Sequence, residues 1–125
     1  MTSYEEYVLT WLRRELIEYN HQIGAGGKHI NVEEVYFEQD GPEGNMIVIL
    51  FREARRPQCL FGFHMGSREP PPMDKLDWQW QESEDPKGSI PQGHATVIFV
   101  NLMERVEAAD MGLPKECDSD GITWI

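Results

Sequence analysis

Hydrophobic residues between positions 3 and 23 recur at every third or fourth position, which is the spacing of one helical face. Ser3 and Glu6 form a capping box at the start of this segment. The glycine-rich residues 24–27 tolerate left-handed backbone and end the pattern. Residues 3–23 are therefore predicted to form an amphipathic helix.

After the glycines, the spacing changes to the alternation that is typical of strands. Residues 33–39 alternate between apolar and polar side chains, as expected for a half-buried strand. Residues 46–51 are apolar on both faces, which favours a central strand. Residues 59–65 alternate again. These three segments are predicted to be the first three strands of a sheet.

The second half of the chain predicts two more strands and a short helix. Residues 76–81 alternate, and residues 95–100 are an apolar, β-branched run that we expect to be a buried strand. Asn101, with Glu104 three residues later, has the pattern of a cap for a short closing helix. Trp124, in the apolar last residues, is expected to dock on the body of the protein.

The predicted order is helix, about five strands, helix, with connections short enough for antiparallel neighbours. We therefore expect a single α+β domain over residues 1–125. Its mainly antiparallel sheet is expected to carry the N-terminal helix and the short C-terminal helix packed on it. Segments 33–39 and 76–81 are the expected edge strands. An exposed edge can pair with a second copy, so either a monomer or a homodimer is consistent with the pattern.

Charge restricts the classes of partner. The chain has 22 acidic and 11 basic residues, a formal net charge of −11, which argues against direct binding of nucleic acid. The longest apolar run is far too short to span a membrane, and the start has no leader pattern. Cys59 and Cys117 match no disulfide framework, so both are expected to be reduced and the protein to be cytoplasmic.

No group of residues meets the requirements of a metal, cofactor or catalytic site. Cys59 and His64 are five residues apart on one predicted strand and therefore point to opposite faces, which argues against a shared zinc ion. Residues 118–121 resemble the start of a calcium loop but lack its closing glutamate. His64 and His94 have no serine elbow near them. We expect no metal, no cofactor and no catalytic residues, and a binding protein rather than an enzyme.

The first functional hypothesis is an acidic protein that covers a basic surface of a partner. Small acidic α+β immunity proteins of bacterial toxin systems are similar in size and charge, and this likeness of composition implies an inhibitor-like role. Charge reversal in the loop after residue 81 should slow association with such a partner. The expected contact acids are Glu82, Glu84, Asp85, Glu116, Asp118 and Asp120.

The second hypothesis is a small-molecule site in an aromatic pocket between the sheet and a helix. Its expected lining is Tyr36, Trp78 and Trp80, with Arg52, His64 or Arg68 as the polar anchor. Arginines are concentrated around the second and third strands, where they suit either an anionic ligand or ion pairs with the abundant acids. These arginines are Arg52, Arg55, Arg56 and Arg68.

Overall fold

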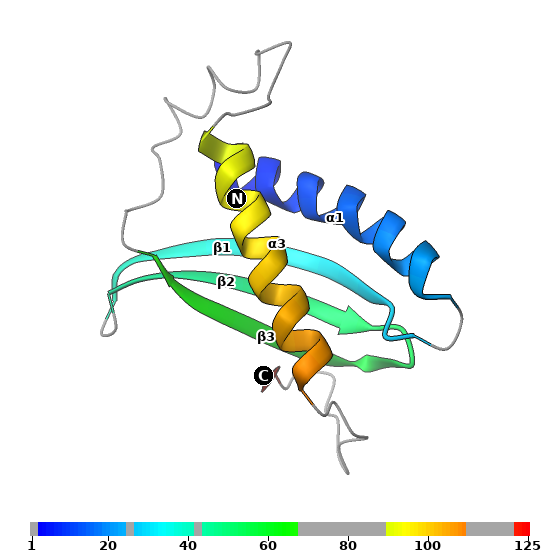
Figure 1. Ribbon diagram of the computed structural model, residues 1–125. Helices are drawn as coiled ribbons and strands as arrows, with labels where there is room; N and C mark the ends of the chain where they lie inside the picture. Colours follow the sequence, from blue (N-terminus) through cyan, green and yellow to red (C-terminus); the bar gives the residue numbers. More distant parts are fainter. Residues whose placement is uncertain (1–2, 25–26, 42–43, 68–89, 110–121) are drawn as a thin grey trace.

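The computed structural model describes residues 3–24, 27–41, 44–67, 90–109 and 122–125, and it has an α+β fold (Figure 1). This confirms the predicted fold class. The helices and strands are α1 Ser3–Ile23, β1 Ile30–Gly41, β2 Gly44–Glu53, β3 Arg56–Ser67, α3 Ile90–Ala108 and β4 Ile122–Trp124.

The four strands form one mixed sheet in the order β1-β2-β3-β4. β1, β2 and β3 are antiparallel neighbours, whereas β4 runs parallel to β3. The strands predicted at 33–39, 46–51 and 59–65 are confirmed, and β2 lies between two other strands as expected. The prediction of about five antiparallel strands is matched only roughly, and segment 76–81 lies outside the described residues.

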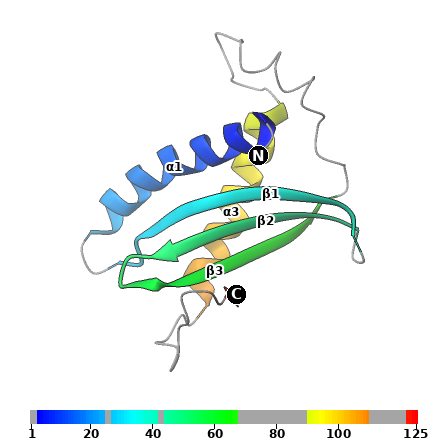
Figure 2. The ribbon, with the colours of Figure 1, turned by 180° about the vertical axis from the view of Figure 1, so that it is seen from behind.

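Helices α1 and α3 lie on one face of the sheet, and the view from behind shows the described strands with neither of these helices in front of them (Figures 1 and 2). The hydrophobic core fills the space between the helices and this face. Full burial of an aliphatic or aromatic side chain stabilises the fold by about 1.5–3 kcal/mol. The most deeply buried core residues include Val8, Leu12, Val35, Ile49, Phe51, Phe61, Ile98, Leu102 and Val106.

Helix α3 corrects the prediction of a strand at 95–100. Its buried side chains follow a three-to-four spacing, from Ala95 through Ile98 and Leu102 to Val106, which only a helix places on one face. The β-branched residues that suggested a strand are also on this helix. Asn101 is not a cap, because it lies inside the helix, where its Nδ2 donates to the carbonyl of Val97 at 2.8 Å.

Helix α3 packs beside α1, and side-chain contacts join the two helices at successive positions. The Tyr19 hydroxyl donates to Glu107, and the pKa of Tyr19 is raised, first by desolvation and then by this hydrogen bond. The contacts move toward the C-terminal end of α1 and of α3 together, so the two helices run in the same direction. The three contacts join Tyr4 to His94, Trp11 to Phe99 and Tyr19 to Glu107.

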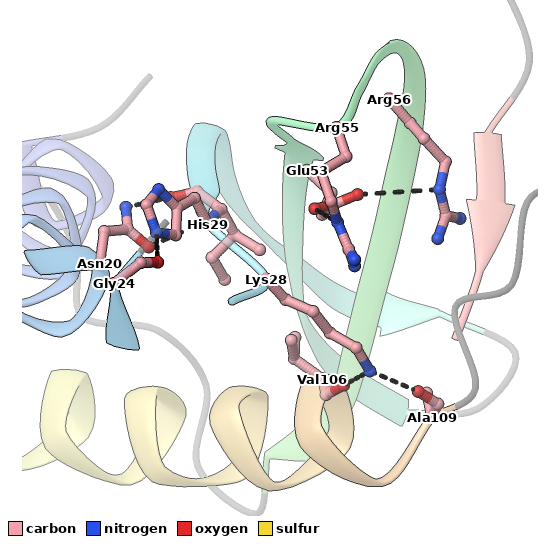
Figure 3. A network of polar contacts seen from close by, with 10 residues as sticks. Asn20, Gly24, Lys28, His29, Glu53, Arg55, Arg56, Val106 and Ala109 are labelled. Carbon is pink, nitrogen blue, oxygen red and sulfur yellow. Dashed lines mark hydrogen bonds and ion pairs between the residues drawn. The ribbon is translucent and has the colours of Figure 1, made fainter. Parts of the chain in front are cut away.

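Lys28 closes the C-terminal end of α3. Its ammonium donates to the carbonyls of Val106 and Ala109 at 3.0 and 2.8 Å (Figure 3). A cation at this end also interacts favourably with the helix dipole. The loop after α1 thereby fixes the end of a helix that lies about eighty residues later in the chain.

Side chains of α1 occupy the outer edge of β1. Backbone groups on a free sheet edge are available to other strands unless something covers them. Here the edge groups of Ile30, Val32 and Phe37 already have partners, so strand pairing there would first have to displace α1. The contacts are Asn20 with Ile30 N and O, Arg13 with Val32 O, and Glu5 with Phe37 N, at 2.8 to 3.2 Å.

Neither described helix is long and apolar enough to cross a lipid bilayer. Cys59 is buried on β3 and is disulfide-bonded, so the expectation of a reduced thiol is wrong for this residue. Disulfides persist mainly in oxidising compartments. The argument from reduced thiols therefore no longer supports a cytoplasmic location, which stays a prediction. Cys117 lies outside the described residues.

Candidate binding face

The face of the sheet that points away from α1 and α3 carries the candidate site. Alternation along each strand fixes its members, because neighbouring residues point to opposite faces. Phe37 packs against Tyr4 of α1, so Tyr36 points the other way. Val48 and Leu50 are buried but lie outside the core cluster between the helices and the sheet. We call this surface the helix-free face: Glu34, Tyr36, Glu38, Val48, Leu50, His64, Ile122 and Trp124.

Strand register aligns these residues in rows across the sheet. Tyr36, Val48 and His64 form one row across β1, β2 and β3. Glu34 and Leu50 belong to the next row, which continues to Gly62. Each row therefore runs from a polar or aromatic residue on β1, over an aliphatic centre, to β3. Three strands contribute side chains to this face, and the aliphatic residues at its centre, Val48 and Leu50, are buried.

The β1 side of the helix-free face is negatively charged. Glu34 and Glu38 are exposed and flank Tyr36 at alternate positions of the strand. The pKa of Tyr36 is raised, mainly by desolvation and further by the negative charges of Glu38 and Glu34. The same charges that disfavour a tyrosinate favour a cation near the ring, and aromatic faces also attract cations.

Trp124 forms the opposite border of this face. Its ring lies over Gly62, where an added Cβ would come within 2.5 Å of ring carbon Cζ3, so only glycine leaves room for it. The His64 ring contacts it edge-on, with centroids 5.2 Å apart. Trp124 remains 50% exposed and Ile122 41% exposed. The expected docking of Trp124 therefore occurs, on β3, and it leaves half of a large aromatic surface open to solvent.

The predicted arginine concentration is a set of ion pairs. Arg52 Nε lies 2.6 Å from Glu33 Oε1, and Arg55 Nε lies 2.6 Å from Glu53 Oε1. Arg56 Nε lies 3.7 Å from the other oxygen of Glu53, whose side chain is fully buried (Figure 3). Arg52, Arg55 and Arg56 therefore form ion pairs with acidic side chains, which is the second of the two roles predicted for these arginines. Arg68 lies outside the described residues.

Of the residues named for a pocket between the sheet and a helix, the structure describes Tyr36, Arg52 and His64. Tyr36 lies on the helix-free face, and Arg52 pairs with Glu33, so neither borders a helix–sheet pocket. His64 lines a shallow groove between β3 and α3 with Phe63 and Met65. The structure brings Tyr36 and His64 into one row, on the other face. Trp78, Trp80 and Arg68 lie outside the described residues.

The six acids named as contacts for a basic partner also lie outside the described residues, so their role stays a prediction. Sequence reasoning did not name Glu34, Glu38 or Trp124 for the site. The signal for the first two was present, because both are polar positions that alternate with apolar ones on a predicted strand. Only the parallel pairing of β4 with β3 puts Trp124 on the same face as Tyr36.

The histidines do not form a common site. His94 packs against Tyr4 on the helix side, whereas His64 contacts Trp124 on the other face of the sheet. Within the described ranges, no three histidine, cysteine or acidic side chains are grouped so that they could hold a metal ion. Comparison of the chain with protein-family models, with curated proteins and with solved structures finds no match.

Proposed function

We propose that the protein is a non-enzymatic, acidic binding protein that covers a basic surface of a partner protein, in the manner of an immunity protein or inhibitor. The observation that carries the proposal is the helix-free face, on which exposed Glu34 and Glu38 flank the half-buried Tyr36 and half-exposed Trp124 forms the opposite border. In protein interfaces, buried tyrosine and tryptophan side chains near the centre contribute most of the binding energy. Charges around them steer the partner toward the interface.

On this proposal, the two sides of the face have different roles. Trp124 and Ile122 supply apolar surface that loses water on contact. Glu34 and Glu38 receive lysine or arginine side chains beside the Tyr36 ring. The net charge of −11 raises the rate at which a basic partner arrives. Glu82, Glu84, Asp85, Glu116, Asp118 and Asp120 would extend the acidic contact surface.

Affinity capture from a native cell extract at low salt tests the proposal. The bait with Glu34→Lys, Glu38→Lys and Trp124→Ala should lose a basic protein that the unchanged bait retains and releases at moderate salt. The control bait carries Glu6→Lys, Glu18→Lys and Val97→Ala, which make the same charge change on exposed positions of the helices. Equal retention by all three baits would exclude the helix-free face as the contact surface.

The small-molecule alternative has less support. Two hollows that are lined by described residues lie between α1 and β1 and between α3 and β3. Neither includes Tyr36 or Arg52. Tyr36, the one of the three expected pocket aromatics that the structure describes, lies on the helix-free face, which favours a protein partner over an enclosed ligand.

A further inference from the structure

We propose that a disulfide between Cys59 and Cys117 fixes β4 on the edge of β3, so that the Trp124 border of the helix-free face is complete only in the oxidised protein. The consequence for binding of a partner rests on the proposed function. The dependence of β4 on the disulfide is a property of the fold alone and can be measured on the isolated protein.

The sequence leaves one partner for Cys59 within the chain. Cys59 is disulfide-bonded, and Cys117 is the only other cysteine in the 125-residue sequence. The Cys59 side chain is 1% exposed and belongs to the core between the helices and the sheet. Because a cysteine of another molecule does not reach a sulfur buried in this way, the bond closes within the chain and joins residues 59 and 117.

This bond links two points of the sequence that are next to the β3–β4 pair. Cys59 directly precedes Leu60, which pairs with Ile122 at the start of β4. Between the described end of the α3 segment and β4 lie the twelve residues 110–121, whereas only the four residues 118–121 lie between Cys117 and β4. A shorter tether raises the effective concentration of β4 at the edge of β3.

The contacts that hold β4 in the described part of the chain are few. β4 is three residues long, and all three residues are exposed. After β4, Ile125 N donates to Gly62 O at 3.2 Å, and the Ile125 side chain packs, partly buried, against the core. Segments with little buried apolar surface open at a small cost in free energy. We therefore expect the covalent link to decide whether β4 stays on β3.

Release of β4 would remove one border of the helix-free face. The Trp124 ring lies over Gly62, and the His64 ring contacts it edge-on. Both contacts depend on the pairing of β4 with β3, which sets Trp124 opposite Gly62. Without the disulfide, the protein would keep exposed Glu34 and Glu38 on β1 but would lose the ordered apolar border opposite them.

The bond forms by thiol–disulfide exchange with an oxidant that itself contains a disulfide, such as oxidised glutathione. The thiolate of one cysteine attacks the oxidant, which gives a mixed disulfide and releases one thiol. The thiolate of the second cysteine then attacks the sulfur of the first and releases the other thiol. Two electrons pass to the oxidant, and the two protons of the cysteine thiols end on its two thiols. Oxidising compartments favour this direction.

Peptide mapping without reduction and NMR relaxation test the proposal together. Mass spectrometry should find one pair of linked peptides that contains residues 59 and 117. The backbone order parameters of Thr123 and Trp124 should be about 0.85 in the oxidised protein and should fall below about 0.6 in Cys117→Ser, which leaves the buried Cys59 in place. Reduction of the unchanged protein with dithiothreitol should give the same fall.

Two controls separate release of β4 from other effects. Val48 lies in β2 between β1 and β3, so its order parameter should stay at about 0.85 in every form that keeps the fold. Trp124→Ala removes the ring over Gly62 but keeps the disulfide, and Thr123 should therefore stay ordered in this variant. Loss of order at Thr123 in Trp124→Ala would assign the hold on β4 to the ring instead of the bond.

A peptide map without the link from 59 to 117, or unchanged order at Thr123 and Trp124 in Cys117→Ser, would overturn the proposal. Equal loss of order at Val48 would also overturn it, because the bond would then hold the whole fold and not β4. If β4 loses order but a Cys117→Ser bait still retains the basic protein, the disulfide has the proposed effect and the role of the Trp124 border in binding is wrong.

Discussion

Replacing Glu53 by glutamine is expected to lower the free energy of unfolding by about 3 kcal/mol. The Glu53 side chain is fully buried at the end of β2, with Arg55 and Arg56 beside it (Figure 3). The Arg56 side chain is only 6% exposed, so removal of the carboxylate leaves its positive charge with one acidic neighbour fewer in a place that water does not reach. Urea unfolding of the two proteins measures the difference.

Glu33→Gln is the matched control, because it removes an ion pair of the same type at the surface. Arg52 and Glu33 are 27% and 47% exposed, and exposed pairs contribute about 0–1 kcal/mol. The control should therefore change stability by less than about 1 kcal/mol. If Glu53→Gln and Glu33→Gln lower the free energy of unfolding equally, burial of Glu53 does not determine the loss of stability.

Ile98→Ala in α3 is expected to destabilise the protein by about 3 kcal/mol, and Val100→Ala by less than about 1 kcal/mol. Ile98 is 1% exposed and belongs to the core, whereas Val100 is 47% exposed. Thermal or urea unfolding of both variants measures the two costs. Far-ultraviolet circular dichroism of the folded variants should stay unchanged, since neither residue is required for the helix itself.

This pair of variants also distinguishes a helix from a strand at 95–100. In a strand, Ile98 and Val100 point to the same face and would be buried together. In a helix, two residues that are two positions apart lie on nearly opposite sides. Similar costs for Ile98→Ala and Val100→Ala would therefore contradict the helix.

The first half of the fold follows from local patterns. Ser3–Ile23 has an unbroken helical spacing and signals at both ends, and the structure places α1 at these residues. The three strands that follow alternate or are uniformly apolar, and only two residues separate β1 from β2 and β2 from β3. Neighbours in sequence are then neighbours in space, so pattern and topology agree.

The second half depends on contacts that local patterns do not contain. The run from Ala95 to Val100 has the composition of a strand, but the spacing of its core residues continues to Val106 with a helical period. The buried face of α3 from Ala95 to Val106 packs against α1 and the sheet, and this packing outweighs the preference of the β-branched residues for a strand. Parallel pairing of β4 with β3 joins segments about sixty residues apart and has no local signal.

The candidate site was predictable only in part. Tyr36 and His64 were named from their chemistry, and the structure aligns them in one row, on the sheet face that points away from α1 and α3. Alternation shows that the two faces of a sheet differ, but it does not show which of them α1 and α3 cover. The ion pairs of Arg52 and Arg55 were expected as an alternative from the abundance of acids.

The association rate constant of the captured basic partner tests the central claim most directly. At low salt, Glu34→Lys with Glu38→Lys should slow association at least about tenfold, because charges near an interface control encounter. Glu6→Lys with Glu18→Lys makes the same change in net charge on α1 and should slow it less than about threefold. Equal slowing by the two pairs would show that only total charge matters, and would contradict a binding site on the helix-free face.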